Sequence, residues 1–205
     1  MHITLTNTGK RFNREWIFRH LNYEFFAGKS YAVTGTNGSG KSTLLLVIAG
    51  AVIHNEGSII YSMKDVKLSN DIYFKQIAIA APYLELIEEL TALEMLEFHS
   101  RFKPLIQGLP ISSILQIAGL EKAANKQIRY FSSGMKQRLK LVQAFLSNTP
   151  VLLLDEPTTN LDEEGIGLYH QLIRDHSKGK LVIISSNDRQ EYEFCDEIIE
   201  MSKYK

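Results

Sequence analysis

The chain has 205 residues, and its 23 Lys and Arg balance its 23 Asp and Glu, so the formal net charge is zero. This length suits one compact domain or one domain with an embedded subdomain. Hydrophobic residues make up 44% of the chain, which argues against a disordered protein, a coiled-coil rod or a collagen-like fibre. The balanced charge argues against strong electrostatic attraction to nucleic acid or to an anionic membrane.

The single cysteine and the hydropathy of the chain indicate the kind of cellular compartment in which the protein works. The only cysteine, Cys195, cannot form an internal disulfide, which indicates a reducing compartment. The longest apolar run, Leu44–Ile53, is interrupted by Gly50 and is shorter than the roughly 18 residues that a membrane span needs. The N-terminal residues lack the apolar core of a signal peptide. Any work at a membrane would therefore require another chain.

Short β-like runs and helical patterns alternate along most of the sequence, which predicts an α/β fold. The last two strand-like runs are continuously apolar, as is typical of strands buried on both faces of a parallel sheet. The expected strands are Ile3–Thr6, Leu21–Phe26, Ser30–Thr34, Ser58–Tyr61, Gln76–Ala81, Val151–Leu154 and Leu181–Ser185. The expected helices between them are Lys41–Ala49, Gly134–Leu146 and Gly165–Asp175.

The middle of the chain differs, because residues 83–147 contain no convincing strand. A capping-box pattern at Thr91 and Glu94 predicts a helix, whose inward side chains should be Leu93, Leu96 and Phe98. A second short helix is expected at Ile111–Ala118, ended by Gly119. We therefore expect a helical subdomain at about 83–147, inserted in a core of about 1–82 and 148–205; the alternative is that these helices cover the sheet itself.

A phosphate-binding loop is predicted at residues 35–42, which match the pattern G-x-x-x-x-G-K-[ST]. An apolar strand precedes the loop and a helix follows it, which is the setting that the mechanism requires. Glycines let backbone N–H groups turn toward phosphate oxygens, and the helix N-terminus adds partial positive charge. Lys41 should reach the β- and γ-phosphates, and the Ser42 hydroxyl should ligate Mg²⁺. The expected nucleotide contacts are Asn37, Gly38, Ser39, Gly40, Lys41, Ser42 and Thr43.

A metal-holding carboxylate is predicted at the end of the strand Val151–Leu154. Asp155 follows this apolar strand, which places its carboxylate at the carboxyl edge of a sheet, beside the phosphate loop. Asp155 would hold Mg²⁺ through water. The adjacent Glu156 can act as general base on the attacking water, so Glu156 and Lys41 are the principal catalytic candidates.

Residues 131–138 read Phe-Ser-Ser-Gly-Met-Lys-Gln-Arg, and this segment resembles the signature motif of ATP-binding-cassette (ABC) ATPases. The order of motifs also resembles that family: phosphate loop, signature, Asp-Glu strand, then a segment at 157–162 that is similar to its D-loop. The resemblance covers nearly the whole chain. It implies a P-loop NTPase core of mostly parallel sheet, with an antiparallel β part near the N-terminus and an inserted helical subdomain.

The resemblance also implies how the signature acts. In ABC ATPases two subunits pair head-to-tail, and the signature of one closes the ATP site of the other. Ser132, Ser133 and Gly134 would thus contact ATP bound to a second subunit, since a helix N-terminus is an anion site. The alternative is that Ser132 only caps the helix. Phe12 stands where the family stacks an aromatic ring on adenine; Trp16 competes for that role, and core packing of Phe12 is the other possibility.

The chain departs from the family pattern at two positions. The family usually carries a Mg²⁺-contacting Gln where Pro82 stands, and Tyr83 or Glu85 could contribute in its place only if the loop is bent. The family also places a His after the strand Leu181–Ser185, where it bonds the γ-phosphate. Asn187 stands there, and its amide can donate a hydrogen bond but cannot carry a proton or a positive charge. We therefore expect ATP binding with slow hydrolysis.

The resemblance implies the ATPase subunit of an ABC transporter, a homodimer around two Mg-ATP molecules that drives a separate membrane permease. Residues 82–90 are the expected permease contact, and no nucleic-acid partner is expected. The chain would lie in the cytoplasm at the inner face of the cell membrane, attached only through the permease. Two alternatives are a regulator with weakened catalysis and a soluble ABC ATPase acting on DNA or ribosomes. The usual extra modules of the second do not fit into 205 residues.

Overall fold

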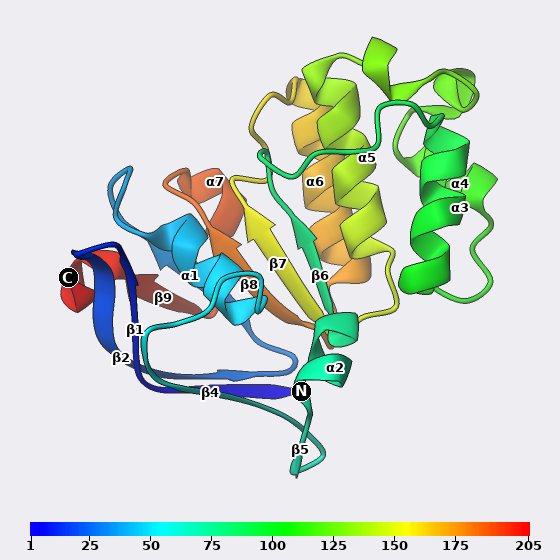
Figure 1. Cartoon of the computed structure of the whole chain (residues 1–205). Helices are drawn as coiled ribbons and strands as arrows, with labels where there is room; N and C mark the ends of the chain where they lie inside the picture. The colour runs from blue at the N-terminus through cyan, green and yellow to red at the C-terminus, as the bar shows by residue number, and fades with distance from the viewer. The chain divides into compact units, whose positions relative to one another are not determined.

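The computed structural model describes residues 1–205, except the side chains of Asn70 and Asp71. The chain forms two compact units (Figure 1). The first comprises residues 1–79, 150–156 and 179–205, and the second comprises residues 80–149 and 157–178. The residues expected in a helical subdomain, 83–147, fall within the second unit, which also includes residues 157–178.

The first unit contains an antiparallel sheet near the N-terminus. Its strand order is β2-β1-β4-β5, and β1 pairs with both β2 and β4. The strands are β1 (His2–Phe12), β2 (Glu15–Phe26), β4 (Glu56–Met63) and β5 (Val66–Lys67). The expected antiparallel β part is therefore confirmed.

A second sheet has the strand order β6-β7-β8-β3-β9. β3 pairs in parallel with β8 and β9, and β7 pairs in parallel with β8, which confirms the predicted α/β class. The strands are β3 (Ser30–Thr34), β6 (Ile77–Ala80), β7 (Val151–Asp155), β8 (Leu181–Ser185) and β9 (Glu197–Glu200). The remaining elements of the first unit are α1 (Lys41–Ile48), α2 (Asn70–Tyr73), η1 (Phe74–Gln76), α7 (Arg189–Tyr192) and η4 (Met201–Tyr204).

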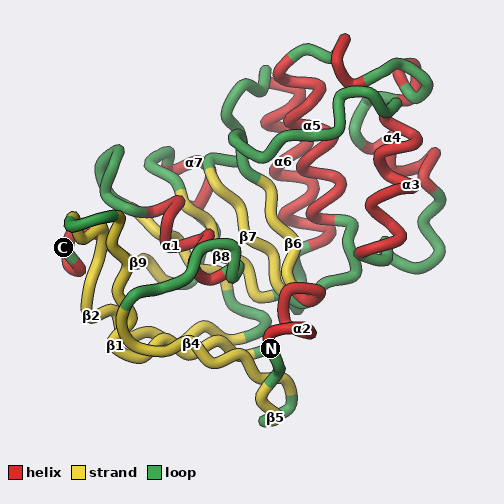
Figure 2. The backbone as a smooth tube through the Cα atoms, viewed as in Figure 1, coloured by secondary structure: helices red, strands yellow, loops and turns green.

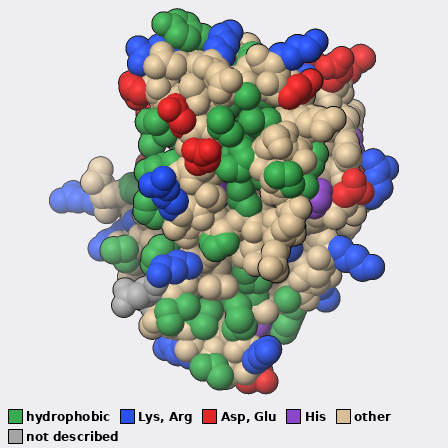
Figure 3. Space-filling view, turned by 90° about the vertical axis from the view of Figure 1, so that its right-hand side faces the viewer, with side chains coloured by type: hydrophobic (Ala, Val, Ile, Leu, Met, Phe, Trp, Pro, Cys, Tyr) green, Lys and Arg blue, Asp and Glu red, His purple; other side chains and the backbone are tan. Residues whose placement is uncertain are grey.

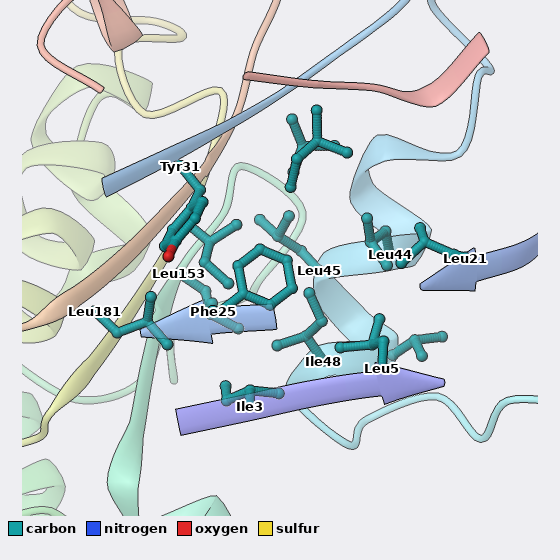
Figure 4. Close-up of a cluster of buried hydrophobic side chains, with 14 of the residues drawn as sticks. Ile3, Leu5, Leu21, Phe25, Tyr31, Leu44, Leu45, Ile48, Leu153 and Leu181 are labelled. Carbon is teal, nitrogen blue, oxygen red and sulfur yellow. The ribbon is translucent and has the colours of Figure 1, made fainter. Parts of the chain in front are cut away.

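The core of the first unit holds α1 against both sheets. Leu45 and Ile48 of α1, Ile3 of β1, Phe25 of β2 and Leu153 of β7 are all inaccessible to solvent and belong to one cluster (Figure 4). Burial of such side chains contributes about 1.5–3 kcal/mol each relative to exposure. Because α1 begins directly after the phosphate loop, this packing fixes the loop's C-terminal end.

The second unit is helical, whereas the strands gather in the first (Figure 2). Its elements are α3 (Ala92–Phe102), α4 (Ile111–Ile117), η2 (Glu121–Ala123), η3 (Ile128–Tyr130), α5 (Ser133–Phe145) and α6 (Glu163–His176). The predicted capping box of α3 is confirmed: the Glu94 N–H donates to Thr91 Oγ1 at 3.2 Å, and the Thr91 N–H donates to Glu94 Oε2 at 2.8 Å.

The expected inward face of α3 is wrong at Phe98. This side chain is 40% exposed, whereas Met95 and Leu96 are buried. Two residues of an α-helix span about 200°, so Phe98 lies on the face opposite Leu96. His99 takes the inward position instead and hydrogen-bonds Ser147.

No helix in the described part of the chain is long and apolar enough to cross a membrane. Figure 3 shows Lys, Arg, Asp and Glu side chains interspersed with hydrophobic ones on the face that it presents. Lys and Arg are spread over the whole of this face, whereas Asp and Glu gather mainly toward the top of the view.

Candidate nucleotide site

Three strands of the parallel sheet end side by side, and each leads into a candidate segment. Both Val33 of β3 and Asp155 of β7 pair with Ser185 of β8, so the three residues form one row. The loop at 35–40 follows β3, Glu156 follows β7, and Asn187 comes two residues after β8. Ligands of open α/β sheets bind at such carboxyl edges, so the parallel order brings these distant segments together.

A cavity of about 360 Å³ lies at this edge and is lined by residues 37–43, Ile17 and Glu156. Gly38 and Gly40 have φ of 77° and 99°, which L side chains rarely adopt. A Cβ on Gly40 would also lie 2.5 Å from Ile17 Cγ2, so a larger residue there would strain the loop. Gly40 is the N-cap of α1 and provides no side-chain cap, which leaves the first-turn N–H groups for an anion.

Lys41 is buried, with only 5% of its surface exposed. Its Nζ donates to Gly35 O at 2.8 Å and to Thr36 O at 3.4 Å, both in the loop that it follows. The ammonium is thus held beside the cavity by neutral carbonyl oxygens. A phosphate oxygen is a stronger partner for a cation than a carbonyl, so Lys41 is placed to exchange these bonds for one to a nucleotide.

Asp155 is 1% exposed, and its Oδ1 has no hydrogen-bond partner in the described part of the chain. The buried Ser185 Oγ, on the residue paired with Asp155, is also without a partner there. A buried carboxylate oxygen is costly unless a cation or donor satisfies it. Among the described residues, no group of three or more His, Cys, Asp and Glu side chains is arranged to hold a metal ion by itself. One carboxylate, the Ser42 hydroxyl and phosphate oxygens are the donor set that Mg²⁺ prefers, so these residues fit that ion.

Glu156 lies on the cavity wall in a left-handed backbone conformation, with φ of 41°. Its N–H donates to Ser185 O at 2.8 Å. Such a conformation is uncommon for a residue other than glycine and persists where the surroundings impose it. The turn directs the chain away from β7 immediately after Asp155 and leaves the Glu156 side chain beside the phosphate loop.

Asn187 contacts the phosphate loop directly: its Nδ2 donates to Asn37 Oδ1 at 3.0 Å. The bond is exposed to solvent, so it contributes little to stability. The bond shows that Asn187, which replaces the expected His, lies beside Asn37 of the cavity lining. Asn187 can donate its amide hydrogens, but it has no titratable group.

The two aromatic candidates for adenine differ in accessibility. Phe12, at the end of β1, is 48% exposed, and Lys10 Nζ lies 4.7 Å from the centroid of its ring. Trp16 is only half-buried rather than exposed, and the guanidinium groups of Arg11 and Arg19 lie 5.4 and 4.2 Å from its ring, so both rings have cations nearby but Phe12 is the more accessible. This arrangement favours Phe12. Neither aromatic side chain lines the 360 Å³ cavity, which Ile17 of β2 contacts instead.

The signature residues begin α5 in the second unit. Ser132 is the N-cap, and its Oγ accepts the Met135 N–H at 3.2 Å. In the single chain this hydroxyl therefore caps the helix, which was the alternative to contact with ATP. Ser132 and Ser133 are exposed at the helix N-terminus. A Cβ on Gly134 would lie 3.1 Å from Asn160 O, which leaves little room for any other residue.

Two side chains tie the signature helix to the segment that resembles a D-loop. Gln137 is buried, and its Nε2 donates to Pro157 O at 2.8 Å. Arg138 lies 2.5 Å from Asp162 Oδ1, and Asp162 caps α6 by accepting the Gly165 N–H. The Gly165 N–H and then Arg138 lower the pKa of Asp162 below its usual range. The two motifs thus form one connected element within the second unit.

Pro82, which stands at the place of the expected Gln, lies in the second unit and acts there through its backbone carbonyl. Lys140 Nζ of α5 donates to Pro82 O at 2.8 Å and to Ala81 O at 3.3 Å. Tyr83 and Glu85, the possible replacements for Gln, are exposed on the segment that follows. The roles of Lys140, Ile17 and Ser185 were not predicted, because they depend on contacts between segments far apart in the chain.

A family model for ABC transporters matches residues 18–159. An uncharacterized ABC transporter ATP-binding protein of Bacillus subtilis, YybJ, is 32% identical over 98% of this chain and 92% of its own length. The putative hemin import ATP-binding protein HrtA of Staphylococcus aureus is 27% identical over 97% of this chain and 94% of its own.

Solved structures agree. A dimeric post-hydrolysis structure of the ATP-binding cassette MJ0796 with ADP and Pi has a TM-score of 0.82 at 27% identity, covering 97% of this chain and 93% of that one. The structure of an ATP-binding subunit of an ABC transporter has a TM-score of 0.84 at 26% identity, with 98% and 85% covered. The family model covers most of the chain, and the sequence and structure matches cover nearly all of it. The chain therefore belongs to the ABC transporter family as an ATP-binding subunit with the fold of its ATPases.

Proposed function

We propose that the cavity at residues 37–43 binds the phosphates of ATP and that Glu156 promotes their hydrolysis. The observation that carries the proposal is the convergence of the phosphate loop, Glu156 and the buried, unpartnered Asp155 carboxylate at one sheet edge. Lys41 would exchange its two carbonyl bonds for phosphate oxygens, and the uncapped N–H groups of α1 would bind the same anion. Phe12 would stack on adenine.

Ser42 and Asp155 would hold Mg²⁺, which neutralises charge on the phosphates when it is bound. Glu156 would orient a water molecule and accept its proton as the water oxygen attacks the γ-phosphate. The loop N–H groups and Lys41 would stabilise the charge on the equatorial phosphate oxygens. Asn187 would donate one amide hydrogen bond to the γ-phosphate and leave Asn37.

Hydrolysis should be slow relative to that of a member with the usual Gln and His. Pro82 offers no side-chain amide, and Asn187 carries no positive charge toward the transferring phosphoryl group. Removing one preorganised donor from a transition state costs about 2.7–4 kcal/mol in enzymes where it has been measured. The alternative, a nucleotide-binding regulator with weakened catalysis, gains no support from the relatives named above. Measurable turnover that depends on Glu156 distinguishes the ATPase from that regulator.

The subunit would work as a homodimer. Ser132, Ser133 and Gly134 lie at an exposed helix N-terminus that could close on ATP bound to a second copy. The matching MJ0796 cassette is described as dimeric in both of its structures, which supports this assembly. The dimer would close when it binds ATP and reopen after hydrolysis, and this motion would drive transport.

A separate membrane permease would receive that motion, through contact with residues 82–90. The named relatives are ATP-binding proteins of transporters, which favours this role over a soluble ATPase acting on DNA or ribosomes. The subunit would then lie in the cytoplasm, at the inner face of the membrane, attached through the permease alone. The balanced charge offers no electrostatic attraction to lipid or to nucleic acid.

Binding and dimerisation can be tested together on the purified chain. Glu156→Gln should form an ATP-dependent dimer on size-exclusion chromatography, because it keeps the phosphate contacts while losing the base. Adding Lys41→Met to Glu156→Gln should abolish that dimer. A chain that stays monomeric with ATP and shows no ATP affinity by calorimetry would contradict the proposal.

A further inference from the structure

The C-terminal turn of the chain contacts the phosphate loop through the buried side chain of Met201. This residue begins η4 and is inaccessible to solvent. A Cβ added to Gly35 would lie 3.3 Å from Met201 Cβ, and a Cβ added to Gly40 would lie 3.6 Å from Met201 Cε. Met201 therefore reaches both ends of the loop at 35–40, although it lies about 160 residues away in the sequence.

The register of the parallel sheet places Met201 beside the loop. The last pair between β3 and β9 joins Thr34 to Glu200, and Gly35 and Met201 are the next residues of the two segments. Neighbouring parallel strands run in the same direction, so the residue after β9 lies next to the first residue of the loop. Met201 also belongs to the buried cluster that contains α1, so the core of the first unit fixes its position.

The backbone at Gly40 is confined by two side chains from different elements. A Cβ there would lie 2.5 Å from Ile17 Cγ2 of β2, in addition to its approach to Met201 Cε. An unbranched, flexible thioether can fill the irregular gap beside a glycine. At the other end of the loop, Gly35 O accepts a hydrogen bond from Lys41 Nζ at 2.8 Å. A shift of Gly35 would therefore displace a partner of the ammonium that is expected to bind phosphate.

A cavity beside these contacts gives the loop room to move. Its volume is about 350 Å³, and it is lined by loop residues and by Glu200, Ser202 and Lys205 of the C-terminal segment, all three of which are exposed. The buried Ser39 Oγ, also on its wall, has no hydrogen-bond partner in the described part of the chain. Shortening Met201 would enlarge this space, and the surrounding backbone can relax into it.

We propose that Met201 is a positioning residue for ATP, which holds Gly35 and Gly40 so that the loop N–H groups and Lys41 face the phosphates. The inference rests on the proposed function and adds to it a residue that acts through the loop. Without the Met201 side chain the loop populates further conformations, and the apparent affinity falls with the fraction that stays competent to bind. A competent fraction of roughly one in ten gives a tenfold loss of affinity.

The test compares Met201→Ala with the conservative variant Met201→Leu and with Leu181→Ala. Leu181 is the matched control, because it is equally buried in the same cluster but begins β8 at the end of the sheet opposite the loop. Unfolding in urea measures the stability that each variant loses, and calorimetry measures its affinity for Mg-ATP. Hydrogen exchange of the Ser39 amide, which donates to Thr36 O at 3.0 Å, reports on the loop without nucleotide.

Met201→Ala should weaken ATP affinity about tenfold and speed exchange of the Ser39 amide, whereas Met201→Leu should stay close to the wild type. Leu181→Ala should lose stability but change ATP affinity by no more than about twofold. In steady-state phosphate release, Met201→Ala should raise KM with little change in kcat, because saturating ATP selects the competent loop. If Met201→Ala does not fold, Met201→Val, which keeps Cβ and loses Cε, is compared with the same control.

Wild-type affinity in a folded Met201→Ala would overturn the inference and leave the proposed function standing. Equal weakening by Met201→Ala and Leu181→Ala would also overturn it, because the loss would then follow stability rather than contact with the loop. A wild-type chain that binds no ATP would overturn the proposed function and the inference with it.

Discussion

Replacing Asn187 with His should accelerate ATP hydrolysis roughly tenfold. Asn187 currently donates to Asn37 at 3.0 Å in an exposed bond, and giving up such a bond costs about 0.5–1 kcal/mol. An imidazolium would place a positive charge beside the γ-phosphate. The difference between charged and neutral hydrogen bonds is about 1–1.5 kcal/mol, which corresponds to roughly tenfold in rate. Asn187→His also removes the side-chain amide that donates to Asn37 Oδ1.

The assay is phosphate release at saturating ATP and Mg²⁺ for the wild type, Asn187→His and Asn187→Ala. A free imidazole titrates near pH 6.5, so the gain from Asn187→His should be larger at pH 6 than at pH 8. Asn187→Ala should be no faster than the wild type, which separates the new charge from simple release of Asn37. A fast wild type whose turnover is unchanged by Asn187→His would refute the reasoning.

Three further predictions concern binding and stability. Lys41→Met should weaken ATP affinity about 10- to 100-fold by calorimetry, because it removes a charged contact of about 1.5–3 kcal/mol; unchanged affinity would exclude Lys41 from the site. Leu153→Ala, at a fully buried position, should lower the free energy of unfolding in urea by about 2–5 kcal/mol, and a loss below 1 kcal/mol would contradict the described packing. Burial, followed by the charge of Lys103, lowers the pKa of His99 to about 4. The folded state thus binds the His99 proton more weakly than the unfolded chain, whose pKa is near 6.5, so stability present above pH 6.5 should fall by about 3 kcal/mol toward pH 4. His99→Gln should flatten that part of the pH profile, and an unchanged profile would show that another group titrates.

The buried parallel strands were predictable because a strand covered on both faces needs an unbroken apolar run. The predicted bounds Ser30–Thr34 and Leu181–Ser185 are those of β3 and β8. β1 extends well beyond the expected Ile3–Thr6, because its pairing with β2 shifts register after Leu5 and interrupts the alternation of buried and exposed residues. β9 was missed since only Ile199 of its four residues is buried.

Some residues of the candidate site were also predictable from the sequence and others were not. The phosphate loop, Asp155 and Glu156 were predictable because each motif is contiguous and its neighbours define a strand or helix. Ile17 was not, because it reaches the loop from β2, where its own neighbours indicate only a strand. Lys140 was not predicted either, because a lysine in a helical pattern is by default a solvated side chain, and only the folded chain shows that it donates to Pro82 O.

Glu156 is the residue on which the account depends most, and its substitution gives the most direct test. Steady-state phosphate release is measured with Mg-ATP for the wild type and Glu156→Gln, alongside ATP affinity by calorimetry. We predict a slow but measurable wild-type rate, a loss of about 100-fold or more in Glu156→Gln, and unchanged ATP affinity. Equal phosphate release by the two proteins would contradict the account, since the group beside the phosphate loop would then take no part in hydrolysis.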